Sequence, residues 1–586
     1  MKNLSLLLMA LLFLLCDVRS VWAENVSYAV SINGVEDKAL QGALENKSLL
    51  FKLVDRVPET TAALDRRIKN DLVAFKEVMK EYGYYDAALT QNTYEENGKR
   101  QIVISVDTGS LYTIKEFTVH WPDKNPPDIA ALQALKLPVG ETALPGIILD
   151  TEQEILTILM QNGYPFPQTS GRKLFVHHEN KSVTVGLFLD PGNVAHFGSV
   201  TITGLKRLEK PFVDRRIRWQ EGEIFNIKKI AVTRKALIDS GVIANVDSQY
   251  NAVVKEEKIP VTLDIKESKH RSIGAGVAYS TILGPTGNVF WEHRNLFGQA
   301  EKLRIKAEGG AATYALGADL IKPDLWSNQD LSWQNSIDFR QDFLEAYDKN
   351  SALASTVLNY KYSDTSAVSG GVALEYSRIQ EESEPDKDFT LLSFPVTYSF
   401  DSTDDFLDPR EGLRFNVGFI PYQVLNGQNS FVKTESKISH YLPFGERFVW
   451  ANWGRASVIN GQTLEDIPAD KRLYAGGSGS VRGYGYQLLG PLDENNNPIG
   501  GRMAFGAGTE GRFKITDTIE AVAFYEGGRV SGDLEFGGHE PFLWGAGSGV
   551  RYHTAIGSLR ADIAVPLDKR EPDHAFQFYI SLGQAF

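Results

Sequence analysis

The second half of the chain, from residue 270 onward, alternates apolar and polar residues with a period of two. This pattern constrains the fold more than any other feature, because successive side chains of a strand point to opposite faces. In the segment SLRADIAVPL, for example, Leu559 and Ile563 share one face, while Arg560 and Asp562 share the other. Gly, Tyr, Phe and Trp are plentiful there, and a helical period is absent. The pattern predicts antiparallel strands with one apolar and one polar face.

The N-terminus predicts a secretory signal peptide over residues 1–23. Lys2 leads into the apolar run LSLLLMALLFLL, which is shorter than the roughly 20 residues that a spanning helix needs. Small residues near Ala23 fit a signal-peptidase site. Cleavage there removes Cys16, the only cysteine, so we expect a mature chain with neither disulfides nor thiol chemistry.

Residues 270–586 are predicted to form a transmembrane antiparallel β-barrel. The sequence has no other long apolar run, and a closed barrel is the remaining structure that satisfies every backbone group in lipid. Turn signals divide this half into about sixteen strands, within the range of bacterial barrels. If the preceding residues are periplasmic, the longest connection, from about residue 460 to 500, is the sixth extracellular loop. That loop contains GGSGSVRGYGY, in which Arg482 lies among glycines and tyrosines.

Three segments in the first half share one pattern, in which a helix-like stretch ends at a glycine and two strand-like runs follow. The glycines are Gly83, Gly163 and Gly241, and their spacing of roughly 80 residues indicates an array of small modules. A glycine ends a helix readily because it adopts the left-handed conformation. The repeated unit reads strand, helix, helix, strand, strand, and it resembles the POTRA (polypeptide-transport-associated) domain. We therefore predict three periplasmic α+β modules, at residues 24–107, 111–190 and 194–268.

Three such modules, a barrel of this size and the sequence VRGY in the sixth outer loop resemble the outer-membrane assembly superfamily. The number of modules favours its TamA-like members, the outer-membrane subunits of the translocation and assembly module. The segment DSTDDFLDPREGLRF is a further family-like stretch of the barrel, and it contains Asp401, Asp404, Pro409 and Gly412. The last strand, AFQFYISLGQAF, ends at Phe586 and resembles the C-terminal signal of bacterial outer-membrane barrels.

Arg482 needs a partner if its loop folds back into the barrel. Glu510 and Glu526 both lie on the polar faces of predicted strands, and polar faces point into such barrels. A guanidinium binds a carboxylate bidentately, and the neighbouring glycines let the loop approach the wall closely. We predict a loop-to-barrel lock in which Arg482, with Gly483 and Tyr484, pins the loop inside through Glu526, Glu510 or both. The alternative is a solvated extracellular arginine.

The resemblance implies a machine that takes unfolded outer-membrane proteins, notably autotransporters, from the periplasm and inserts and folds them in the outer-membrane lipid. The first and last strands meet at a seam that contains Gly274, Gly276 and Gly583. Glycines weaken strand pairing, and an open seam offers free backbone groups to an incoming strand. The resemblance also implies an inner-membrane partner of the TamB type, docked on the first POTRA module. The alternative is a two-partner-type secretion pore for one dedicated exported protein.

Composition and motifs argue against other functional classes. The net charge of −13 disfavours nucleic-acid binding, which needs a basic face. The serines of GGSGS lack the spacing and the strand–helix context of a nucleophile elbow. The sequence contains neither a glycine-rich phosphate loop nor a metal-ligand cluster. We therefore expect no catalytic residue, no enzyme activity, no cofactor and no metal.

Overall fold

A computed structural model describes most of the chain, while the predicted signal peptide, Gly583 and Phe586 lie outside the part that it describes. No helix within that part is both long and apolar enough to cross a membrane. The chain divides into two compact units, and segments that belong to one unit or the other alternate along residues 202–262. The described residues are 26–122, 126–250, 257–280, 284–382, 384–535, 540–554 and 557–582.

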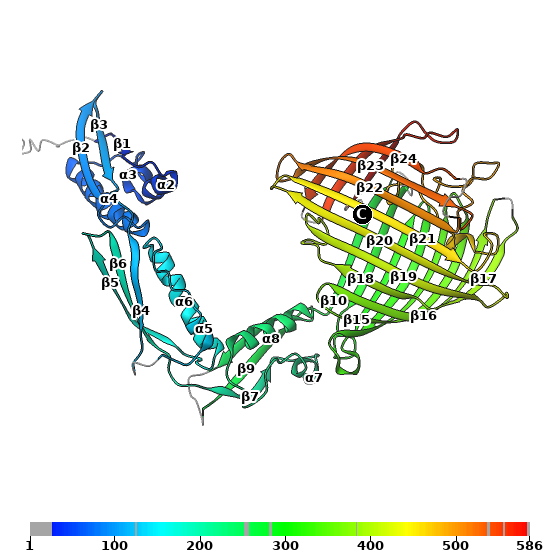
Figure 1. The fold of residues 1–586 in the computed structure, drawn as a ribbon, viewed down its shortest axis with the longest axis horizontal. Coiled ribbons are helices and arrows are strands. Elements are labelled where there is room, and N and C mark those ends of the chain that lie inside the picture. The colour runs from blue at the N-terminus through cyan, green and yellow to red at the C-terminus, as the bar shows by residue number, and fades with distance from the viewer. Residues whose placement is uncertain are drawn as a thin grey trace, which may run out of the picture. The chain divides into compact units, whose positions relative to one another are not determined.

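The first module packs helices on a three-stranded sheet of order β1–β3–β2, in which β1 runs parallel to β3 (Figure 1). Helix α2 begins where Oδ1 of Asp37 accepts the N–H of Ala39 at 2.7 Å, and Thr60 caps α4 in the same way. Leu64 and Phe75 lie on the buried face of α4, whereas β2 is mostly exposed at the sheet edge. The elements are β1 (Tyr28–Asn33), α2 (Lys38–Lys47), α3 (Leu49–Lys52), α4 (Thr61–Glu81), β2 (Ala88–Glu96) and β3 (Lys99–Asp107).

The second and third modules repeat this order of strands, as β4–β6–β5 and β7–β9–β8. Gly83, Gly163 and Gly241 each follow the long helix of their module with a positive φ (85°, 98° and 73°), the conformation in which glycine ends a helix. The elements are β4 (Thr113–His120), α5 (Ala130–Gln133), α6 (Pro145–Gln161), β5 (Gln168–His177), β6 (Ser182–Asp190), β7 (His196–Thr203), α7 (Lys210–Asp214), α8 (Ile227–Asp239), β8 (Ile243–Tyr250) and β9 (Lys258–Glu267).

Seventeen strands, β10 to β26, form one antiparallel sheet in chain order, and Figure 1 shows them curving around a common interior. Strand β10 contacts β26, and within the described residues the hydrogen-bonded ladder ends at these two strands. The strands are β10 (Arg271–Ser280), β11 (Gly284–His293), β12 (Lys302–Gly310), β13 (Thr313–Lys322), β14 (Leu331–Phe343), β15 (Asp348–Lys361), β16 (Ser366–Gln380), β17 (Lys387–Ser393), β18 (Val396–Asp401), β19 (Gly412–Val424), β20 (Ser430–Phe444), β21 (Phe448–Asn460), β22 (Met503–Lys514), β23 (Ile519–Ser531), β24 (Leu543–Thr554), β25 (Gly557–Pro566) and β26 (Gln577–Leu582).

The sheet has seventeen strands, whereas the sequence predicted about sixteen. The extra strand arises from an interruption at Phe394 and Pro395. Strands β17 and β18 pair with the same two neighbours, β16 and β19, and the register on each neighbour is unchanged across the gap. Proline has no N–H to donate to a ladder, although the carbonyl of Pro395 still accepts the N–H of Gly371 at 3.0 Å. Strands β17 and β18 therefore lie end to end in one position of the sheet.

The two faces of the C-terminal strands differ in polarity. On β22, Glu510 is buried, whereas Phe513 on the other face is 48% exposed. On β25, Asp562 is buried, whereas its neighbour Ile563 is 48% exposed. Charged side chains inside and large apolar side chains outside are typical of a barrel that faces lipid. The buried charges of these strands gather at one place in the interior.

Candidate functional site: a loop locked inside the barrel

The connection between β21 and β22, residues 461–502, folds against the inner wall of the barrel. Val481 and Tyr484 are fully buried, and they pack in one apolar cluster with Leu543 of β24. The Oη of Tyr484 donates to the carbonyl of Trp544 at 2.9 Å. This apolar contact fixes the part of the loop that carries Arg482.

Arg482 is completely buried and donates to three carboxylates on three strands. Its Nε donates to both oxygens of Glu526 on β23 at 3.1 Å, and its Nη2 contacts the same carboxylate. Nη2 also lies 2.9 Å from Oε2 of Glu510 on β22, and Nη1 lies 3.0 Å from Oδ2 of Asp562 on β25. The Cζ of Arg482 lies 3.3 Å from the centre of the Phe524 ring. The structure thus brings Arg482 to both carboxylates named from the sequence and to a third.

Asp562 escapes the sequence-based prediction, although the alternation already places it on the polar face of its strand. Three further buried arginines surround these carboxylates. Arg512 donates to Glu510 at 2.8 Å, and Nε of Arg560 lies 3.2 Å from Asp562. Arg551 contacts both carboxylates. Glu510 and Asp562 therefore each have cationic neighbours besides the loop.

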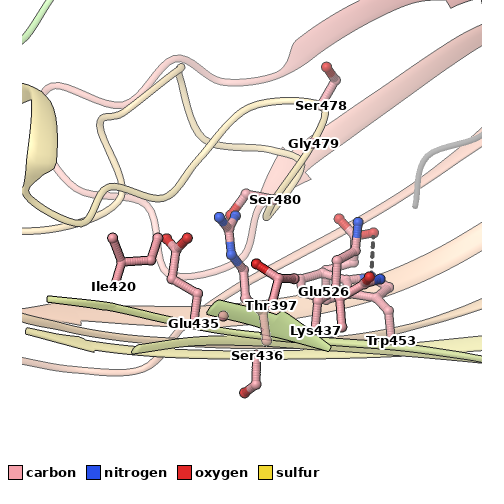
Figure 2. Close-up of a pocket in the computed structure, with 13 residues that line it drawn as sticks. Thr397, Ile420, Glu435, Ser436, Lys437, Trp453, Ser478, Gly479, Ser480 and Glu526 are labelled. Atoms are coloured by element: carbon pink, nitrogen blue, oxygen red, sulfur yellow. Dashed lines mark hydrogen bonds between the residues drawn. The ribbon is translucent and has the colours of Figure 1, made fainter. Parts of the chain in front are cut away.

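Glu526 depends on the loop more than the other two carboxylates do. It accepts bonds from the side chain of Arg482 and from the backbone N–H of Arg482, the latter at 2.9 Å. It also accepts a bond from Nε1 of Trp453 at 3.4 Å, which Figure 2 shows. Among the described residues, Arg482 is the one cation that forms a salt bridge with Glu526. A buried carboxylate needs a counter-charge, and for Glu526 the loop supplies it.

The loop backbone touches the backbone of the wall on both sides of Arg482. A Cβ on Gly545 of β24 would lie 2.1 Å from the carbonyl oxygen of Arg482, and a Cβ on Gly483 would lie 2.8 Å from that of Val565. Gly483 also has a φ of 105°, a conformation that favours glycine, and its N–H donates to Oη of Tyr579 at 3.1 Å. Neither glycine position has room for a side chain.

A second group of buried charges holds the loop at η2 (Ala469–Lys471). Asp470 accepts a bond from Nζ of Lys349 on β15 at 2.6 Å and lies 3.0 Å from Nζ of Lys471. Glu375 on β16 accepts bonds from the same two lysines at 2.9 and 2.6 Å. No sequence motif marks this anchor, because its members are distant in sequence and only the closed sheet brings them together.

A cavity of about 300 Å³ lies between the tip of the loop and strands β18 to β21 (Figure 2). Lys437 and Arg455 are direct cross-strand neighbours in its wall, and Ser478 and Ser480 line it from the loop. A polar, charged lining of this kind is typical of a water-filled lumen. In the part of the chain that the structure describes, no group of three or more His, Cys, Asp or Glu side chains could hold a metal ion.

The family-like stretch between β18 and β19 folds into a self-bonded turn. Oδ1 of Asp404 accepts two N–H groups of the turn at 2.9 and 3.1 Å, and Oδ2 of Asp401 accepts a bond from Arg414 at 2.9 Å. Pro409 is buried, and Gly412 closes the turn with a φ of 111°. These four residues are not part of the Arg482 cluster themselves.

The seam glycines that the structure describes lie on β10. A Cβ on Gly274 would lie 2.4 Å from the ring of Phe290 on β11, and a Cβ on Gly276 would lie 3.0 Å from Oδ1 of Asn288. Both glycines therefore make room for side chains of the neighbouring strand. Their role in a seam stays a prediction.

A separate polar contact lies just before the first barrel strand, where Glu267 ends β9. Its carboxylate accepts the N–H groups of Lys206, Arg207 and Leu208 at 2.7 to 3.0 Å, and Nε2 of His270 lies 2.9 Å from it. Burial raises the pKa of Glu267, but these bonds outweigh burial and lower the pKa to about 2. The carboxylate therefore stays charged and bonded near neutral pH.

Comparison with known proteins gives a family for the barrel. Residues 295–586 match the model of the Omp85 superfamily domain, and residues 195–268 match a POTRA model described as a surface antigen variable number repeat. The chain is 24% identical over 556 residues to outer membrane protein assembly factor BamA of Nitratidesulfovibrio vulgaris, covering 89% of this chain and 68% of that protein. It is 21% identical over 596 residues to BamA of Neisseria meningitidis serogroup B, covering 89% and 73%.

A solved structure shows the same fold. The crystal structure of BamA from Haemophilus ducreyi lacking POTRA domains 1–3 superposes with a TM-score of 0.70 at 18% identity. The match covers 81% of this chain and all of that one. These relatives carry the name BamA, so the expected TamA-like subtype stays a prediction.

Proposed function

Because residues 295–586 make this chain a member of the Omp85 superfamily, its barrel lies in the bacterial outer membrane with POTRA structure in the periplasm, and we propose that it assembles other outer-membrane proteins there. The observation that carries the proposal is the similarity to two outer membrane protein assembly factors, each aligned with 89% of this chain. Such work consists of templating strands, so the proposal includes neither an enzymatic reaction nor a cofactor.

The finer part of the proposal concerns clients and partner. We propose a TamA-like subunit with three POTRA modules, with autotransporters among its clients and an inner-membrane partner of the TamB type on the first module. Three sheets with the same strand order support the module count. The exposed edge strand β2 supports the docking site, because its unpaired backbone groups accept an added strand.

The locked loop favours assembly at a seam over passage through the lumen. Breaking a buried ion pair by removing one partner costs roughly 3–5 kcal/mol, and the Arg482 cluster contains several such contacts. A secretion pore would have to release the loop, whereas a seam between β10 and β26 leaves it in place. Strand edges at such a seam offer backbone groups to an incoming client strand.

A reversible crosslink across the seam tests this function. In a Cys16→Ser background, single cysteines within residues 272–277 of β10 are combined with single cysteines within residues 577–582 of β26, and pairs that oxidise completely are kept. Assembly of an autotransporter barrel into proteoliposomes is then measured before and after reduction. We expect the oxidised protein to be inactive and the reduced protein to recover.

The matched control is a crosslink between two neighbouring strands in the middle of the sheet. Asn335 and Thr356 are direct partners on β14 and β15, so Asn335→Cys with Thr356→Cys staples a ladder that the mechanism leaves intact. This control should assemble clients normally when oxidised. Full activity of a completely crosslinked seam would contradict the lateral mechanism and favour the two-partner-type pore.

A further inference from the structure

The turn between β18 and β19, residues 402–411, lies at the periplasmic end of its strands, counting strand positions from β10 at the end of the third module. Its tip carries Phe406 and Leu407, which are 75% and 59% exposed. Its base is held by the bonds to Asp404 and by the buried Pro409. The turn therefore presents apolar side chains to the periplasm on a fixed base.

Two neighbouring residues of this turn contact inward-facing side chains of two neighbouring strands. Nη1 of Arg410 lies 3.5 Å from Oε2 of Glu520 on β23, which is 1% exposed. The carbonyl of Pro409 accepts a bond from Nη1 of Arg512 on β22 at 3.3 Å. The base of the turn thus rests on the inner wall rather than on the barrel rim.

Arg512 also belongs to the Arg482 cluster. Its Nε donates to Oε1 of Glu510 at 2.8 Å, and Oε2 of the same carboxylate accepts a bond from Arg482 at 2.9 Å. The three side chains are at most 1% exposed. One guanidinium therefore contacts the periplasmic turn directly and contacts the outer loop through a single carboxylate.

We propose that Arg512 is a positioning residue that couples the periplasmic turn to the outer loop, so that loosening either one loosens the other. The fixed fork of donors in a guanidinium holds the Pro409 carbonyl and the Glu510 carboxylate at once, which the single ammonium of a lysine does not do. Coupling between two sites is reciprocal by thermodynamic necessity. A client that presses on Phe406 and Leu407 would then loosen the contacts of the loop without releasing it from the lumen; that step rests on the proposed assembly function, whereas the coupling itself does not.

The first experiment perturbs the loop and measures the turn. A spin label is attached to Leu407→Cys in a Cys16→Ser background, and its spectrum is recorded in purified full-length protein without any client. We expect Arg482→Ala to reduce the immobile component of the spectrum. Arg512→Gln should reduce it as well, and adding Arg482→Ala to Arg512→Gln should have no further effect. Lys437→Gln, which faces the neighbouring cavity and forms no salt bridge in the described chain, should leave the spectrum unchanged.

The second experiment runs in the opposite direction. A label on Gly479→Cys, where an added Cβ meets nothing within 4 Å, reports on the loop. Asp404→Asn weakens the base of the turn and should mobilise this label in the wild-type background, but not in Arg512→Gln. If Arg482→Ala prevents folding, Arg482→Lys replaces it, because the charge is kept while the fork is lost. An unchanged Leu407 label in the loop variants, or equal responses with and without Arg512, would overturn the coupling, whatever the outcome of the client assay.

Discussion

Glu526 should be the carboxylate that is left without a counter-charge when Arg482 is removed. Arg482→Ala leaves Glu510 and Asp562 beside other arginines, but it leaves Glu526 buried with no salt bridge in the described chain. A second substitution that removes the charge of Glu526 should therefore restore stability to Arg482→Ala. The same substitution at Glu510 should not, because that carboxylate keeps cationic neighbours.

The magnitudes follow from the burial of the pair. Removing one member of a buried ion pair costs roughly 3–5 kcal/mol, of which an unsatisfied buried group accounts for about 1–3 kcal/mol or more. Arg482→Ala should lower the free energy of unfolding by the first amount. Adding Glu526→Gln should return roughly 1–3 kcal/mol of it, since the amide has no charge to desolvate. Adding Glu510→Gln should not restore the free energy of unfolding but should lower it further.

Urea unfolding of the purified protein in detergent, followed by tryptophan fluorescence, measures these differences, because Trp453 lies against Glu526. The slopes of the transitions must agree between variants before the midpoints are compared. Lys437→Gln serves as a control for loss of a lumenal charge outside the lock. Equal rescue by Glu526→Gln and Glu510→Gln, or strictly additive effects of Arg482→Ala and Glu526→Gln, would show that the proposed division of charges is wrong.

Three further outcomes are expected. Gly545→Ala places a Cβ against the carbonyl of Arg482 and should release the loop, which increased protease cleavage between β21 and β22 would reveal, whereas Gly479→Ala should not. Asp470→Asn should lower the urea midpoint, because it removes the charge shared by Lys349 and Lys471. The stabilisation due to Glu267, whose pKa is lowered to about 2, should be complete above the ordinary carboxyl pKa of 4.5 and should be lost as the pH falls toward 2. The difference in urea midpoint between wild type and Glu267→Gln should therefore be constant near neutral pH and should shrink below pH 4.5.

Alternation along strands was enough to predict which side chains face the interior. It placed Glu510, Glu526 and Asp562 on polar faces, and the long loop between strands marked Arg482 as the residue in need of a partner. Which of these carboxylates reach one guanidinium depends on the curvature and stagger of β22, β23 and β25, and a single strand does not encode those quantities. Asp562 was missed for this reason.

Other features lie beyond periodicity altogether. The anchor at Asp470 sits in an irregular segment, and its partners Lys349 and Glu375 precede it by about a hundred residues, so no local pattern connects them. The contact of Arg512 with Pro409 joins β22 to the turn between β18 and β19, and the long loop separates these two elements in sequence. Such contacts appear only when the sheet closes and brings separate strands around one interior.

The position of the loop in the chain has a consequence for how this barrel itself is built. The anchor at η2 uses Lys349 and Glu375, which are synthesised before the loop. The carboxylates that bind Arg482 lie on strands that are synthesised after the loop. The last of these contacts involve Asp562 on β25 and the hydroxyl of Tyr579 on β26, which accepts the N–H beside Arg482. The base of the loop can thus be fastened early, whereas the contacts of its tip begin with β22 and β23 and are complete only when the final two strands are in place. A chain that stalls before those strands are in place keeps a tip with incomplete contacts, and the loop thereby distinguishes a finished barrel from an unfinished one.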